Sequence, residues 1–60
     1  MFEVISGTYE EFEGELTPNC KFTNGFDTFE EAYRVYKRQT KVSWAALYMG
    51  VELVLGYDPL

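Results

Sequence analysis

The sequence contains no histidine and only one cysteine, Cys20. Histidine is the commonest general acid–base side chain at neutral pH, so its absence removes the usual catalytic triads and dyads. Zinc sites are built mainly from cysteine and histidine, and one cysteine cannot supply such a set within a monomer. No glycine-rich phosphate loop or calcium-loop spacing occurs. We therefore expect no catalytic residue, no metal site and no cofactor, and we expect that the protein is not an enzyme.

Basic residues are scarce as well. Ten acidic residues against five basic ones give a net charge of −5. A domain that binds a phosphate backbone normally carries an excess of bases, so this balance argues against direct binding of nucleic acid or anionic lipid. It favours a partner with a basic surface.

Long apolar runs are also missing. The most apolar stretch, residues 42–57, contains Glu52 and is too short to span a bilayer. The first seven residues have neither the basic region nor the apolar run of a signal peptide. A single cysteine excludes an internal disulfide, which is typical of proteins from a reducing compartment. These features predict a cytoplasmic protein without a membrane segment.

Aromatic residues are plentiful, with five Phe, five Tyr and one Trp in 60 residues. A chain of this length buries only about 60% of the surface that its unfolded form exposes, so most large side chains must join one core. Aromatic side chains supply the most buried area per residue. We expect one folded domain over residues 1–60.

A helix is predicted over about residues 29–40. Thr28 and Glu31 have the spacing of a capping box, with Thr28 as the N-cap. Acids lie in the first turn and bases toward the end, as the helix dipole prefers. The apolar residues with helical spacing, which predict the buried stripe, are Phe29, Ala32, Tyr33 and Tyr36.

Residues 43–57 are compatible with a second helix or with a β-hairpin. Ser43 could cap a helix and Gly56 could end it, but that helix would be apolar on nearly every side, which so small a protein cannot bury. We expect a hairpin that turns at Gly50. The face expected to pack on the helix consists of Trp44, Ala46, Tyr48, Leu53, Leu55 and Tyr57.

The N-terminal half predicts less regular structure. Residues 2–6 read as a strand and residues 20–23 as a short strand that ends in the turn signal Asn24-Gly25. Residues 8–15 fit either one helical turn or an extended arm with Phe12 and Leu16 tucked in. The fold class is therefore α+β, with one helix on a three- or four-stranded, mainly antiparallel sheet.

Two surfaces stand out as candidates for partner binding. The first is acidic and carries aromatic rings between its carboxylates: Tyr9, Glu10, Glu11, Phe12, Glu13 and Glu15. Such an arrangement can imitate a nucleic-acid backbone or enter a basic groove. The second is the other face of the predicted hairpin, which is apolar, lacks a cover and includes Leu47, Met49 and Val54. Cys20 is expected to be a small, half-buried strand residue.

Between Phe26 and Asp58 the chain resembles the small acidic accessory proteins encoded by bacteriophages. The resemblance lies in the size, the acidity and the segment Phe-Asp-Thr-Phe-Glu-Glu-Ala followed by a strand. It implies a protein that binds and inhibits or modulates a basic, nucleic-acid-handling host protein, and it assigns no functional residue. The alternative function is a small homodimeric structural protein that associates through the apolar C-terminal hairpin.

Overall fold

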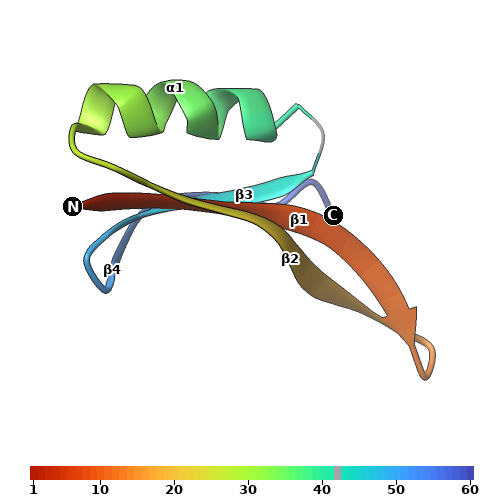
Figure 1. Cartoon of the computed structure of the whole chain (residues 1–60). Helices are drawn as coiled ribbons and strands as arrows, with labels where there is room; N and C mark the ends of the chain where they lie inside the picture. The colour runs from red at the N-terminus through yellow and green to blue at the C-terminus, as the bar shows by residue number, and fades with distance from the viewer. Residues whose placement is uncertain (42) are drawn as a thin grey trace.

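The computed structural model describes residues 1–41 and 43–60. Its elements in chain order are β1 (Phe2–Phe12), β2 (Glu15–Phe26), α1 (Phe29–Gln39), β3 (Trp44–Met49) and β4 (Glu52–Tyr57). The strands form one sheet in the order β2-β1-β3-β4, and each neighbouring pair is antiparallel. The helix lies on one side of this sheet (Figure 1). The predicted α+β architecture is confirmed.

Helix α1 begins as its capping box predicts. The Thr28 hydroxyl accepts the backbone N–H of Glu31 at 3.2 Å and lies 3.0 Å from the Glu31 carboxylate, to which it donates. One otherwise unpaired N–H of the first turn is thereby satisfied. The helix ends at Gln39, with Lys37 and Arg38 in its last turn, where cations offset the partial negative charge of the carbonyls.

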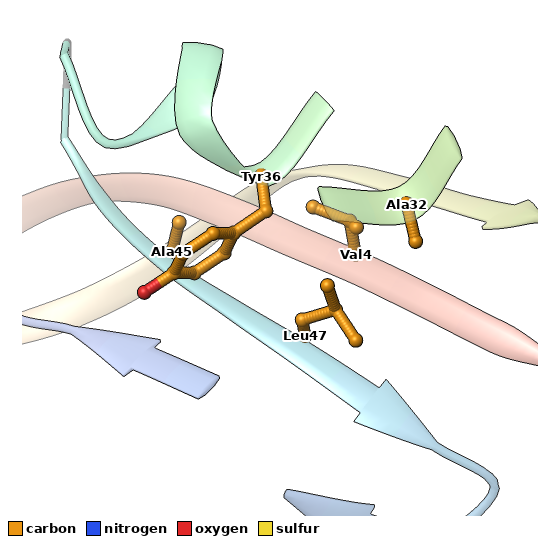
Figure 2. Packing of buried hydrophobic residues seen from close by; sticks show 5 residues of the cluster. All are labelled: Val4, Ala32, Tyr36, Ala45 and Leu47. Atoms are coloured by element: carbon orange, nitrogen blue, oxygen red, sulfur yellow. The ribbon is translucent and has the colours of Figure 1, made fainter. Parts of the chain in front are cut away.

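The core lies between α1 and the two central strands (Figure 2). Val4 of β1 and Leu47 of β3 are fully buried beneath Ala32, which is also fully buried. Tyr36 covers the end of this layer near Ala45. Burial raises the pKa of the Tyr36 phenol, and the neighbouring Tyr33 and Tyr57 contribute to the rise.

The predicted helix stripe is only partly buried. Phe29 and Tyr33 keep 40% and 41% of their surface exposed. They form a row of rings at the margin of the core, where Phe29 meets the Phe2 ring edge-on with centroids 5.8 Å apart and stacks on Tyr33 at 5.6 Å. Val35 packs against the core in their place. The buried stripe is thus centred on Ala32 and Tyr36.

The C-terminal segment is the predicted hairpin, and it turns at Gly50-Val51. Gly50 has a φ of 63°, which glycine adopts without the steric cost that a Cβ would add. The Gly50 N–H donates to the Met1 carbonyl at 3.1 Å, which ties this turn to the start of the chain.

The hairpin face that meets the helix differs from the prediction in β3 and at Leu53, whereas Leu55 packs on the core as predicted. Ala45 and Leu47 lie under α1, whereas Trp44, Ala46 and Tyr48 point to the opposite, uncovered face. Ala45 and Leu47 are compact and wholly apolar, so they permit close helix packing. Trp44 and Tyr48 carry polar groups that need a partner or water.

A register shift between β3 and β4 explains why Leu53 and Leu55 lie on different faces of the sheet. Leu47 pairs with Leu55, but the next residue of β3, Tyr48, pairs with Leu53, so that Val54 is the extra residue of a bulge. Leu55 therefore shares a face with Leu47, while Leu53 shares a face with Tyr48. A bulge of this kind reverses the alternation of side chains, and the regular pattern of the sequence does not reveal it.

Strands β1 and β2 are longer than the strands predicted over residues 2–6 and 20–23, and they form a hairpin. Strands β1 and β2 pair from Phe2↔Phe26 to Phe12↔Glu15, so residues 8–12 are extended and the helical alternative is wrong. The turn between them has positive φ at Glu13 (53°) and Gly14 (84°), as tight hairpin turns with a right-handed twist require.

The turn predicted at Asn24-Gly25 is also wrong. Both residues lie inside β2 and pair with Val4 and Glu3 of β1. The Asn24 side chain accepts the Gly25 N–H at 2.9 Å, which is the local bond that usually stabilises a turn. Pairing along the whole length of β1 outweighs this local preference.

The assignment of faces can be tested by two leucines. We expect Leu47→Ala, which empties a fully buried site, to lower the free energy of unfolding by about 2–5 kcal/mol. Leu53→Ala, at a residue that is 55% exposed, should cost less than about 1 kcal/mol. Urea unfolding measures both. A larger loss at Leu53 than at Leu47 would mean that the helix covers the opposite face.

Candidate functional site

The distal half of the first hairpin extends past the end of the helix (Figure 1). We call residues 8–19 the acidic arm. Its two strands pair continuously, from Thr8↔Asn19 to Phe12↔Glu15. The molecule is elongated as a result, with principal extents of 39 × 22 × 16 Å. The arm is thus an ordered ribbon that the helix leaves uncovered.

The structure brings the predicted acidic residues together on this arm. Glu10 and Glu11 lie on β1, Glu13 lies in the turn and Glu15 begins β2, and all four are exposed. Glu10 contacts the Lys21 ammonium at 3.5 Å and accepts a hydrogen bond from the Asn19 amide. Within residues 1–41 and 43–60 that is the one ion pair, so the other arm carboxylates face solvent.

Apolar side chains accompany these carboxylates. Phe12 and Leu16 are 70% and 57% exposed, so the prediction that they are tucked in is wrong. In the part of the chain that the structure describes, no second layer covers the arm for them to pack against. A shallow hollow of about 250 Å³ lies beside Phe12 and is lined by Glu10, Glu11, Phe12, Thr17, Pro18 and Asn19. Exposed aromatic side chains such as Phe12 are enriched at protein-binding surfaces.

The apolar surface predicted from Leu47, Met49 and Val54 is not exposed as a whole. Leu47 belongs to the core, with no exposed surface. Met49 and Val54 are 48% and 41% exposed, and they lie on β3 and β4, away from the acidic arm. Because α1 covers Ala45 and Leu47, the uncovered apolar face is the one on the other side of the sheet.

This open sheet face holds a hollow of about 380 Å³ that sequence reasoning missed. Its centre is formed by Ala46 and Gly56, which pair across β3 and β4 and have almost no side chain. Larger groups surround this centre: Tyr9, Trp44, Tyr48, Leu53 and Asp58. The alternation of Trp44, Ala46 and Tyr48 in the sequence was the available signal.

Three hydrogen bonds hold the rim of the hollow. The Trp44 indole Nε1 donates to the Thr8 carbonyl at 3.0 Å, opposite Gly7, which pairs with Trp44 and offers no side chain. The Tyr9 hydroxyl donates to Oδ1 of Asp58, and the Leu60 N–H donates to the same oxygen at 3.0 Å. The C-terminal segment is thereby tied to β1.

The hydrogen bonds to Asp58 shift the pKa values of Tyr9 and Asp58. Hydrogen bonding to the Asp58 carboxylate raises the pKa of Tyr9 to about 12, and the negative charge of Asp58 adds to the rise. The bond from Tyr9, together with the bond from Leu60, lowers the pKa of Asp58. Asp58 therefore stays a carboxylate at neutral pH.

Three of the five bases lie on another part of the molecule. Arg34, Lys37 and Arg38 are exposed on α1, which lies on the opposite side of the sheet from Trp44. With Phe29 and Tyr33, two of them line a third hollow of about 390 Å³ along the helix. The basic side of the molecule and its acidic, aromatic side are thus separate.

Three further features concern the cysteine, metal binding and membrane-spanning helices. Cys20 is exposed on β2 rather than half-buried, and its thiol lies 3.4 Å from the Phe22 carbonyl oxygen. The described residues contain no group of three or more acidic or cysteine side chains placed to hold a metal ion. In the same part of the chain, no helix is long and apolar enough to cross a membrane.

Comparison with protein-family models, with curated proteins and with solved structures finds no match to the chain.

Because Tyr9 donates a hydrogen bond to Asp58, we expect the protein to lose stability at alkaline pH. Because folding raises the pKa of Tyr9 from 10.0 to about 12, its contribution is complete below pH 10 and disappears as the pH rises through 12. We expect Tyr9→Phe to remove this part of the pH dependence. We expect Asp58→Asn to return the Tyr9 midpoint toward its ordinary value in an NMR titration of ring-labelled tyrosine. An unchanged midpoint would show that the pair is not formed in solution.

Proposed function

We propose that this chain is a non-catalytic protein-binding module that contacts a basic protein surface through the acidic arm. The observation that carries the proposal is the position of Glu11, Glu13 and Glu15 at the end of a paired ribbon that the helix does not cover. A projecting ribbon can enter a groove that a flat surface cannot reach. The carboxylates attract a basic partner over a distance, and Phe12 supplies apolar contact after docking.

The order within the arm supports the same proposal. Side chains on a flexible loop lose conformational freedom on binding, which weakens the complex. Here the backbone is already fixed by pairing with its neighbour strand, and the turn adopts positive φ at Glu13 and Gly14. The negative groups are therefore held at strand spacing before a partner arrives.

The resemblance to bacteriophage accessory proteins agrees with this mode of action. Proteins of that kind commonly bind and inhibit a host protein, in some cases as mimics of nucleic acid. We propose that the arm occupies a basic groove of such a host protein and so inhibits or modulates it. The net charge of −5 favours a basic partner and opposes contact with nucleic acid itself.

The alternative function, a homodimer through the apolar hairpin, depends on a surface that includes Leu47. Since Leu47 is buried under α1, that contact would require the helix to move away. We therefore propose partner binding through the acidic arm ahead of homodimer formation.

The experiment compares two triple variants of equal charge. The arm variant carries Glu11→Gln, Glu13→Gln and Glu15→Gln, and keeps Glu10, which contacts Lys21. The control variant carries its three neutralised acids away from the arm: Asp27→Asn, Glu30→Gln and Glu52→Gln. Each set takes the net charge from −5 to −2. Both should stay folded, because exposed charges contribute little to stability.

Affinity capture from the native cells, followed by mass spectrometry, identifies proteins that the wild type retains and that the arm variant loses. For such a partner, we expect the arm variant to associate more slowly and with a weaker dependence on salt, while the control variant behaves like the wild type. Equal association rates for the two variants would show that the position of the charges is irrelevant, and the arm would then be excluded as the binding site.

A further inference from the structure

The hollow on the open sheet face combines aromatic rings with negative charge. Trp44 and Tyr48 line it, and Asp58 stands at its rim. Glu3 lies on the same face, since it pairs directly with Tyr48. No lysine or arginine lines the hollow among the described residues. Rings with nearby carboxylates and no competing base form a favourable environment for a cation.

The shape of the hollow selects a flat group. Ala46 and Gly56 line the hollow and pair across β3 and β4, and their small size leaves room there between the larger lining side chains. A guanidinium group is planar, stacks on aromatic faces and is less strongly hydrated than an ammonium group. The volume of about 380 Å³ also admits the aliphatic part of a long side chain and the backbone on either side of it.

The rim is fixed in place before any ligand binds. The indole of Trp44 is held by its bond to the Thr8 carbonyl, and Asp58 is held by the bonds that Tyr9 and Leu60 donate. Both bonds to Asp58 use Oδ1. Within residues 1–41 and 43–60, Oδ2 accepts no hydrogen bond, and this leaves it free to accept one from a ligand.

We propose that the hollow on the open sheet face receives arginine side chains from an extended segment of a partner protein, with one guanidinium stacked on Tyr48 beside Glu3 and another bonded to Asp58 at the Trp44 end. The proposal rests on the proposed function in one respect: the segment belongs to the same basic partner that the acidic arm contacts. The arm and the hollow adjoin, since Tyr9 and Pro18 belong to the arm and also line the hollow.

The negative charge of the open sheet face favours an arginine side chain over a nucleic acid or a second copy of the chain. A nucleic acid could stack its bases on the same rings, but its phosphates would meet Asp58 and Glu3. A second copy of the chain, related by two-fold symmetry, would bring the same two carboxylates against their equivalents. Only a cationic segment turns the charges of this face into an attraction.

Trp44 is the single tryptophan of the chain, so its fluorescence reports on the hollow directly. The probe is a capped peptide of sequence Ser-Arg-Pro-Arg-Ser, titrated into the whole chain. Its control is the same peptide with citrulline in place of arginine, which keeps the shape and removes the charge. We expect a saturable change in emission with the arginine peptide and none with the citrulline peptide.

Paired variants locate the site. We expect Tyr48→Leu to weaken binding of the arginine peptide by about three- to tenfold, the range for loss of a cation–π contact. Its control, Tyr33→Leu, removes an exposed ring on the helix side and should leave the affinity unchanged. We expect Asp58→Asn to weaken binding by about threefold, as loss of an exposed ion pair predicts, whereas its control Asp27→Asn should not.

Three results would overturn the proposal. Equal binding of both peptides would mean that charge is not recognised, and equal binding by Tyr48→Leu and the wild type would place the peptide elsewhere. A shift in Trp44 emission with protein concentration alone, with a doubled mass in sedimentation, would show that a second copy covers the face. The arm triple variant should still bind the peptide, so the failure of the arm as a binding site is distinguishable from the failure of the hollow.

Discussion

The molecule has one helix and a sheet with two faces, and the contact that seals one face decides the character of the other. Ala32 and Tyr36 pack on Val4, Ala45 and Leu47, and among residues 1–41 and 43–60 these five are the buried hydrophobic residues. An eleven-residue helix cannot cover more than part of one face. The distal hairpin and the whole opposite face of the sheet consequently remain accessible. Both candidate surfaces of the protein are consequences of this single contact.

The sequence predicts those elements whose signals are local. Thr28 and Glu31 specify the start of the helix, and Gly50 specifies the turn of the second hairpin, because each acts through its own backbone or through a neighbour a few residues away. The acidic arm was also recognisable from Glu10 to Glu15 as a candidate surface. The sequence does not determine its extended conformation, because pairing with β2 is a contact between residues far apart in the chain, for which no nearby residue gives a signal.

The helix-facing side of the hairpin could not be predicted for two physical reasons. Both sides of β3 are apolar, so hydrophobicity alone does not distinguish Ala45 and Leu47 from Trp44 and Tyr48. The distinction comes from the polar ends of the two aromatic residues and from the close helix packing that alanine permits. In addition, the bulge at Val54 exchanges the faces within β4, so a prediction based on regular alternation assigns Leu53 and Leu55 to one side when they lie on two.

The edges of the sheet indicate why a partner would use a face or the arm rather than add a strand. β2 and β4 are the two edge strands. On β2, Pro18 lacks the N–H that strand addition needs, and the irregular pairing around Lys21 interrupts the hydrogen-bonding row. On β4, the bulge at Val54 breaks the row in its middle. Both edges are therefore poor templates for another strand, and the accessible side chains outside the helix include the carboxylates and aromatic rings of the two candidate surfaces together with aliphatic groups such as Val51 and Leu53.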